Sequence, residues 1–308
     1  MNSKTLSYII KRIVLAIFTV FLIITITFFA MHAIPGGPFL SEKAKSAETI
    51  AALEAKYGLD KPLFQQYTTY LNDVIHFDFG PSIKQRGLTV NQIIGAGFST
   101  SAKIGLVAAF IAISVGIVLG CIAAINRSKF IDRAIMVLST ASVAMPSFVI
   151  GTFLFIIFCV DLQILPANGA LKGGLILPTI ALSLSPMAYI TRLTRSSMLD
   201  VLQQDYIRTA RAKGVPTVKI IFKHALRNSL IPVITYAGPM IAGILTGSMV
   251  VEKIFAVPGL GKKFVSSITN RDYPMIMGTT IFLATLVVIM NLVSDILYKI
   301  VDPRIDFD

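Results

Sequence analysis

The sequence predicts an all-α polytopic membrane protein with six transmembrane helices. Of its 308 residues, 55% are hydrophobic and only 14% are charged, whereas a soluble chain of this kind carries about 25% charged residues. One globular core could not enclose this much apolar surface, so lipid must be a second solvent. The net charge of +12 does not indicate nucleic-acid binding, because the bases lie between apolar runs and no motif for nucleic acid is present.

Six apolar runs are long enough to cross the hydrocarbon core, which needs about 20 mostly apolar residues. They lie at residues 9–33, 99–125, 134–159, 174–191, 230–251 and 276–299. The first follows basic residues, as in a signal peptide, but it is too long for a cleaved segment and we expect it to be retained. Pro178 and Pro186 predict a kink in the fourth run. Gly243 and Gly247 predict a face of the fifth on which another helix packs closely.

The basic residues predict the orientation. With the amino terminus in the cytoplasm, the inner face carries sixteen of the 28 bases and seven of the 16 acids, a net +9 against +3 outside. Most outer bases fall in the long segment 34–97, where the positive-inside rule loses force. We therefore expect a multi-pass protein of the cytoplasmic (inner) membrane with both termini in the cytoplasm.

The chain divides into four parts. These are an N-terminal transmembrane helix at 1–33, an extracytoplasmic helical segment at 34–97, a five-helix core at 98–302 with a cytoplasmic loop at 192–229, and a cytoplasmic tail at 303–308.

The extracytoplasmic segment has helices of its own. One is expected around 46–57, ending at Gly58, and a second after Asp60 with Pro62 in its first turn. The apolar stripe of the second comprises Leu63, Tyr67, Tyr70, Leu71, Val74 and Ile75. We expect the pair to form a small cap against the membrane helices.

We identify no catalytic or energy-coupling motif in the sequence. The histidines His32, His76 and His224 have no metal-binding spacing, and Cys121 and Cys159 lie in apolar runs as packing residues. The stretch "AVPGLGKKF" lacks the leading glycine and the Ser or Thr of a phosphate-binding loop. The middles of the spans have almost no ionisable residues of the kind that couple transport to an ion gradient. We expect no enzyme activity, no metal and no cofactor, and a partner that supplies energy.

The stretch "YIRTARAKGVPTVKIIFKHALRN", Tyr206 to Asn228, carries six bases and no acid between two apolar runs. Gly214 divides it into two helices. One face of the second helix is apolar and comprises Val218, Ile221, Phe222 and Ala225. This pattern predicts a basic amphipathic helix on the inner membrane surface. The first helix is slim, which suits either docking into a groove of another protein or simple contact with lipid.

This stretch resembles the cytoplasmic loop of ABC-importer permeases of the oligopeptide/dipeptide/nickel subfamily. The wider family has E-A-A, then Gly, then I-x-L-P. Here Ala210 and Gly214 match, Thr209 and Arg211 replace the Glu and the second Ala, and "HALR" replaces I-x-L-P. These replacements are typical of the peptide-permease branch. Five further stretches resemble the subfamily in the same order: "YGLDKP", "FGPS", "VVEKIFAVPGLGKKF", "RDYPMIMG" and "DPR".

The resemblance implies the type I ABC importer permease fold and a membrane-spanning subunit that translocates di- or oligopeptides, driven by a separate ATPase. The implied partners are a second homologous permease subunit, two cytoplasmic ABC ATPase subunits that bind ATP, an extracytoplasmic substrate-binding protein, the peptide and the lipid bilayer. A nickel or other small-solute permease is the alternative within the subfamily, and an ion-coupled secondary transporter is the alternative outside it.

The resemblance also implies two sites. The ATPase-docking residues are Ala210, Arg211, Ala212, Lys213 and Gly214. The residues of an outer gate or receptor-facing surface are Glu252, Phe255, Pro258, Gly259 and Gly261.

Overall fold

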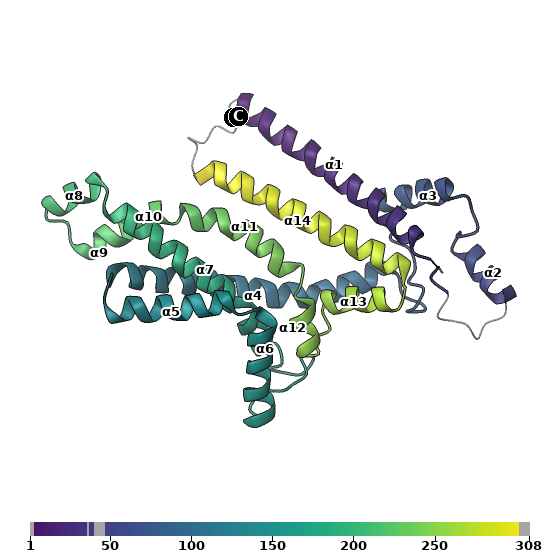
Figure 1. The fold of residues 1–308 in the computed structure, drawn as a ribbon. Helices are drawn as coiled ribbons and strands as arrows, with labels where there is room; N and C mark the ends of the chain where they lie inside the picture. Colours follow the sequence, from purple (N-terminus) through teal and green to yellow (C-terminus); the bar gives the residue numbers. More distant parts are fainter. Residues whose placement is uncertain (1–2, 36, 40–46, 302–308) are drawn as a thin grey trace. The chain divides into compact units, whose positions relative to one another are not determined.

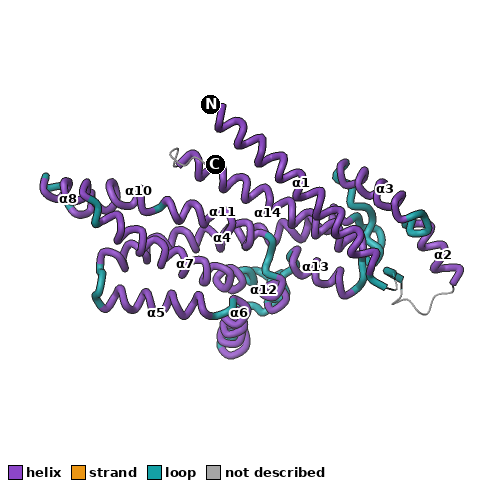
Figure 2. Tube along the Cα trace, turned by 45° about the horizontal axis from the view of Figure 1, so that its top comes forward, coloured by secondary structure: helices purple, strands orange, loops and turns teal. Residues whose placement is uncertain are grey.

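The computed structural model describes residues 3–35, 37–39 and 47–301. Within these ranges the chain is helical and forms no strand, apart from one isolated bridge between Pro81 and Thr89 (Figures 1 and 2). It divides into two compact units. The first consists of residues up to Thr100 together with Gly259–Val288, and the second of Ser101–Pro258 together with the residues from Ile289 onward.

Five stretches of the described chain are helical, long and apolar enough to cross a membrane. They are α1 (Ser3–Ala33), α4 (Val90–Ile125), α7 (Ile176–Leu202), α11 (Ile231–Leu245) taken with α12 (Met249–Ile254), and α14 (Tyr273–Val301). The number rises to six if the bent pair formed by α5 (Phe130–Ala144) and α6 (Ser147–Phe155), continued by the π-helix η2 (Ile156–Asp161), is one span.

The third predicted span, 134–159, is not one continuous helix. The helices on either side of the break enclose an angle of 101°, and α6 points away from α5 in Figure 1. The break lies at Met145, which is extended with φ −86° and ψ 127°. Pro146 causes it, because proline lacks an N–H and disfavours the helical conformation of the residue before it. The third predicted span is therefore helical on both sides of a sharp bend at Met145.

Helix α7 is the central helix of the second unit and contacts α5, α6, α11 and α12. It continues to Leu202, eleven residues beyond the predicted end of the fourth run at 191. Pro178 lies in its first turn, where the missing N–H has no helical partner to lose. Pro186 lies inside the helix.

Two glycines of α4 allow this helix to approach α7. A Cβ at Gly116 would lie 2.8 Å from Cγ2 of Ile190, and one at Gly120 would lie 2.5 Å from Cβ of Thr194. Both glycines are buried. Small residues at such a crossing are the usual basis of helix packing in membranes, where apolar burial alone does not hold helices together.

The close-packing pair predicted in the fifth run is wrong. Helix α11 ends at Leu245, and Gly247 lies beyond it with φ +84°. Only Gly243 is on the helix; it is exposed, and a Cβ there would meet no other atom of the described chain within 4 Å.

The two helices predicted in the segment 34–97 are present in the first unit. Helix α2 (Ala47–Lys56) ends just before Gly58, which has φ +67°. Helix α3 (Leu63–Ile75) begins after Pro62, which is its N-cap and not part of the first turn. Ser46 lies outside the described residues.

Helix α3 packs on α1 and on the start of α14 through part of its predicted stripe. Tyr67 and Tyr70 contact a buried cluster that includes Phe28 and Tyr273, and the Tyr67 hydroxyl lies 2.8 Å from Oγ1 of Thr25. The two ends of the stripe, Leu63 and Ile75, are exposed. The expected cap is therefore present over the middle of the stripe.

We expect Gly120→Ala to destabilise the protein by about 1–3 kcal/mol, because the added methyl group forces α4 away from α7. The matched control is Gly95→Ala on the same helix. Gly95 is exposed, and a Cβ there would meet no atom of the described residues within 4 Å, so helix propensity alone should make that change neutral or stabilising by up to about 1 kcal/mol. Thermal unfolding of both variants in detergent measures the difference. Equal melting temperatures would contradict the close approach.

Candidate functional site

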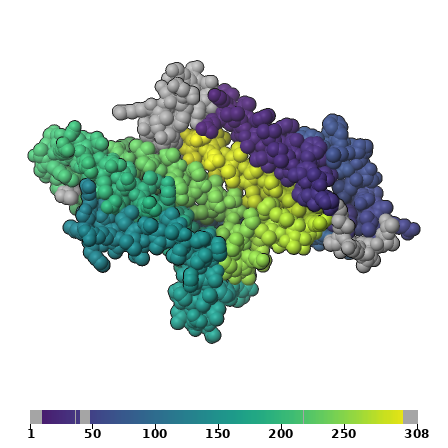
Figure 3. All heavy atoms as spheres, in the orientation of Figure 1, coloured from purple at the N-terminus to yellow at the C-terminus, as the bar shows by residue number. Residues whose placement is uncertain are grey.

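The predicted docking residues lie on and just after a short helix, α8 (Asp205–Ala212). This helix lies at one end of the second unit, and the space-filling view shows it at the left edge (Figure 3). Ala210 is half-buried, and Arg211, Ala212, Lys213 and Gly214 are exposed. One side chain, Ile207, anchors α8 and is completely buried. The structure therefore brings all five predicted residues together on a surface.

Helix α8 ends in a left-handed C-cap. Gly214 has φ +72°, its N–H donates to the carbonyl of Arg211 (2.9 Å), and the next N–H, of Val215, donates to the carbonyl of Ala210 (3.1 Å). These two bonds satisfy carbonyl groups of the last turn that have no helical partner. Ala210 and Val215 also pack on the same buried cluster. The turn is thus closed by hydrogen bonds and by an apolar contact.

The second helix of the stretch comprises α9 (Thr217–Lys219), the π-helix η3 (Ile220–Ala225) and α10 (Leu226–Ser229). The predicted apolar face is only half right: Ile221 and Ala225 are buried, but Val218 and Phe222 are 66% and 65% exposed. The π-helix explains the difference, because bonding from i to i+5 changes the spacing of residues on a face. The buried face consists of Ile220, Ile221 and Ala225, and it packs on residues of α4, α7 and α8.

A tyrosine fastens the start of α8 to α10. The hydroxyl of Tyr206 accepts a hydrogen bond from the side-chain amide of Asn228 (2.9 Å) and lies 3.4 Å from the carbonyl oxygen of His224, to which it donates. With Ile207 buried beside it, α8 is held at its first turn and at its C-cap.

An ion pair joins α5 to α7. In the sequence, its two residues counted only toward the charge that predicts the orientation in the membrane. Arg195 donates through Nε to Oδ1 of Asp132 (2.6 Å) and through Nη2 to Oδ2 (2.8 Å). The N–H of Ser128 donates to the same carboxylate (2.9 Å). Asp132 is 3% exposed. A single acid between Lys129 and Arg133 was the available signal for a specific partner.

The predicted outer residues of the second unit are mainly buried. Glu252 of α12 is 2% exposed, and its Oε1 accepts a hydrogen bond from the hydroxyl of Ser101 (2.7 Å). Phe255 is fully buried and lies edge-on to Phe155, with ring centroids 5.7 Å apart. Pro258 is exposed.

The predicted outer residues of the first unit, Gly259 and Gly261, are both buried. Gly259 is the N-cap of α13 (Leu260–Thr269). The start of α13 lies close to Gly97 of α4, where a Cβ would be 3.1 Å from the Cα of Leu260. Of these five residues, Pro258 is exposed and the other four are buried.

This helical architecture and its short exposed helix are features of transport permeases, and comparison with known proteins agrees. The chain belongs to the family of binding-protein-dependent transport system inner membrane components, whose model matches residues 116–307. The N-terminal model of the same kind of component matches residues 5–111. The protein is therefore a multi-pass inner-membrane protein, and the resemblance noted in its sequence is confirmed.

Individual relatives narrow the comparison. The dipeptide transport system permease protein DppB of Bacillus subtilis (strain 168) is 50% identical over 299 residues, 97% of this chain and 97% of the relative. The oligopeptide transport system permease protein OppB of Salmonella typhimurium is 44% identical over 305 residues, 98% of this chain and 100% of the relative.

A solved structure shows the fold. A chain of the MetNI methionine ABC transporter, in an inward-facing conformation, matches with a TM-score of 0.56 at 16% identity, covering 68% of this chain and 96% of that chain. The fold is thus the type I ABC importer permease fold that the resemblance implied.

We expect Arg195→Met to destabilise the protein by about 3–5 kcal/mol, because it leaves the Asp132 carboxylate buried without its charged partner. The double variant Asp132→Leu with Arg195→Met should recover much of this loss, since no buried charge remains. The control is Arg208→Met: Arg208 pairs with Asp205 at 3.4 Å, but both side chains are exposed, and such pairs contribute little. Thermal unfolding in detergent tests this. A single variant no less stable than the double one would contradict the role of the pair.

Proposed function

We propose that this chain is the membrane-spanning permease subunit of an ABC importer that carries di- or oligopeptides across the cytoplasmic membrane. The observation that carries the proposal is α8, an exposed helix that ends in the glycine C-cap at Gly214 and is held on the membrane helices by Ile207. The names and the high identity of the peptide-permease relatives support the substrate class.

In this mechanism the half-buried Ala210 and the exposed residues from Arg211 to Gly214 bind in a groove of a cytoplasmic ATPase. Closure of an ATPase pair on ATP then moves α8. The motion passes into α7 because the second helix of the stretch packs on both α8 and α7. From α7 it passes to α5 through the Asp132–Arg195 pair and to α4 at Gly120. Tightly packed contacts of this kind transmit displacement, since packed interiors deform little.

The remaining parts of the assembly follow from the same proposal. The proposal requires no ATPase site, metal or cofactor in this chain, because ATP binds to two partner ATPase subunits. A second homologous permease completes the pathway, and an extracytoplasmic binding protein delivers the peptide. Both termini lie in the cytoplasm, in agreement with the net +9 of that face. The residues proposed for an outer gate or receptor-facing surface are Glu252, Phe255 and Pro258 in the second unit, and Gly259 and Gly261 in the first; of these, Pro258 is exposed.

The function is tested by reconstituting the chain in liposomes with its partner permease, ATPase subunits and binding protein, and supplying a labelled dipeptide. We expect uptake that requires both ATP and the binding protein. Uptake by the chain alone under an ion gradient would contradict the proposal in favour of a secondary transporter. ATP-driven uptake of nickel without uptake of peptide would support the importer mechanism but contradict peptide as the substrate.

The docking role predicts graded losses at Gly214. The left-handed conformation costs a residue with a Cβ about 1–2 kcal/mol, and among such residues asparagine tolerates this conformation best. We expect Gly214→Asn to keep most of the ATP-driven uptake, Gly214→Ala to lose part of it, and Gly214→Val to lose all of it, with equal amounts of protein in the membrane.

The matched control for this series is Gly87→Val. Gly87 has φ +82°, and, as at Gly214, a Cβ there would meet no other atom within 4 Å among the residues that the structure describes. Gly87 lies in the first unit, away from α8 in the sequence. It should therefore retain uptake. Normal uptake by Gly214→Val, or equal losses in both valine variants, would eliminate the docking role.

A further inference from the structure

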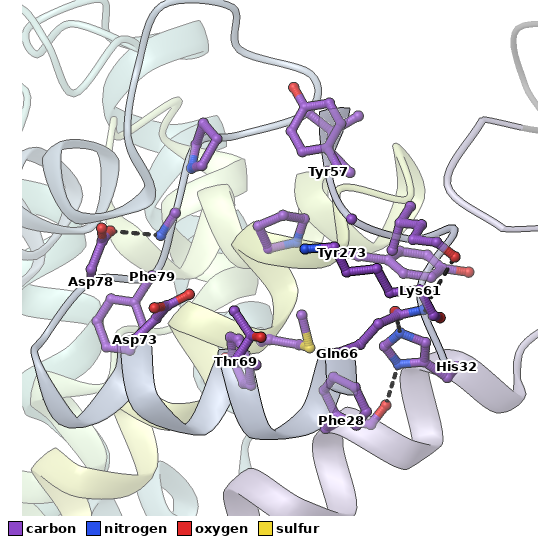
Figure 4. A pocket seen from close by; sticks show the side chains of 18 of the residues that line it. Phe28, His32, Tyr57, Lys61, Gln66, Thr69, Asp73, Asp78, Phe79 and Tyr273 are labelled. Atoms are coloured by element: carbon purple, nitrogen blue, oxygen red, sulfur yellow. Dashed lines mark hydrogen bonds between the residues drawn. The ribbon is translucent and has the colours of Figure 1, made fainter. Parts of the chain in front are cut away.

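The first unit contains a pocket that the proposed function does not use (Figure 4). It is bounded by α1, α3, the segments before and after α3, and the start of α14, and its volume is ≈ 250 Å³. That is room for about eight water molecules at their volume in the liquid. Its aromatic lining includes Phe28, Tyr57 and Phe79. The pocket is thus large enough for a small organic molecule.

Two tyrosine hydroxyls at this pocket have no hydrogen-bond partner in the described part of the chain. Tyr70 and Tyr273 both line it, and the oxygen of each is buried without a hydrogen bond to any described residue. Tyr273 is only 5% exposed. Burial raises the pKa of Tyr70, so this phenol stays protonated and remains a donor at neutral pH. Because buried donors are nearly always paired in folded proteins, these two unpaired hydroxyls beside the pocket are available to donate to a group bound there.

Charged groups of opposite sign lie at opposite ends of the pocket. Figure 4 shows Asp73 and Asp78 at one end and Lys61 at the other. Asp78 uses Oδ1 to accept the N–H of Gly80 (2.9 Å). Neither Asp73 nor Lys61 forms an ion pair with any residue in the described part of the chain. The half-buried carboxylate and the amine are therefore both available to a ligand.

The cationic end is also positioned by the chain. The side-chain amide of Gln66 donates to the carbonyl oxygens of Leu59 (3.1 Å) and Lys61 (2.7 Å). This orientation turns its Oε1 toward Nε2 of His32, 3.0 Å away. The backbone that carries Lys61 is thus tied to α3 and, through His32, to α1.

We propose that this pocket binds a small zwitterion of the amino acid or dipeptide class. Its ammonium group faces Asp73 and Asp78, and its carboxylate faces Lys61. The hydroxyls of Tyr70 and Tyr273 donate to its carbonyl or carboxylate oxygens. Its apolar side chain contacts the aromatic rings, which also favour a nearby cation. The site rests on these residues alone and not on the proposed transport activity.

The test is titration calorimetry on the purified full-length chain in detergent, with alanyl-phenylalanine as the probe. Two analogues each remove one charge: N-acetyl-alanyl-phenylalanine has no ammonium group, and alanyl-phenylalanine amide has no carboxylate. We expect binding of the parent dipeptide and an affinity at least about tenfold weaker for each analogue, since charge-assisted hydrogen bonds are the strong ones. No binding, or equal binding of all three probes, would overturn the site.

Variants separate this pocket from binding elsewhere on the chain. We expect Asp73→Asn and Tyr70→Phe each to weaken binding of the dipeptide about tenfold, and Asp60→Asn, an exposed position outside the lining, to leave it unchanged. Tyr70→Phe should also leave the melting temperature of the unliganded protein unchanged or higher, because it removes an unpaired buried hydroxyl. If that variant does not fold, Asp73→Asn decides.

Undiminished binding by the variants that fold would place the dipeptide elsewhere and overturn the proposal. No ATPase or binding protein takes part in this measurement. A failure to detect dipeptide binding therefore would not contradict the proposed importer function. A failure of the uptake experiment would not contradict the proposed binding site.

Discussion

The structure depends on how its helices end. A helix leaves the carbonyl groups of its last turn without partners within the helix, and the residues that follow can satisfy some of them. Five α-helices of the described chain satisfy one of these carbonyl groups in the same way: a residue of positive φ follows the helix, and the next N–H bonds back to a carbonyl five residues earlier. These residues are Gly58, Phe77, Gly214, Ala256 and Arg271. In each case the next N–H reaches back across the turn, at distances of 2.8–3.1 Å.

These turns determine where the functional groups lie. The turn at Phe77 places Asp78 at the pocket of the first unit, and the turn at Gly214 leaves α8 exposed. The turn at Arg271 places Asp272, whose carboxylate accepts hydrogen bonds from the hydroxyl of Ser82 and from the N–H of Ile83 (3.2 Å). The junction of α13 and α14 is thereby joined to the loop before α4. The backbone conformation at the helix ends thus determines how side chains are arranged at each site.

The sequence predicted these turns only where glycine occupies them. The turns at Gly58 and Gly214 were recognisable because glycine adopts positive φ without a steric penalty. The turns at Ala256 and Arg271 could not be recognised from the sequence. Positive φ costs a residue with a Cβ about 1–2 kcal/mol, and only the surrounding contacts explain why these residues adopt it. At Ala256, the neighbouring residues Phe255 and Val257 are fully buried, which holds the turn in place.

The length and composition of the apolar runs were sufficient to predict the membrane spans. Pro146 was a signal in the sequence for the break in the third span. No signal in the sequence predicted the π-helix after Lys219.

The Asp132–Arg195 pair shows why charge counting predicts orientation better than it predicts sites. Removing both residues from the count leaves the net charge of the proposed inner face unchanged, so the orientation argument does not depend on what they do. Their geometry, however, gives them a structural role, because the carboxylate accepts from Arg195 twice and from the N–H of Ser128. Arg195 lies on α7, two turns before that helix ends at Leu202. In the proposed importer, a displacement of α8 that moves α7 would reach α5 through this short, doubly bonded contact, and the bases Arg211 and Lys213 beside Gly214 are exposed.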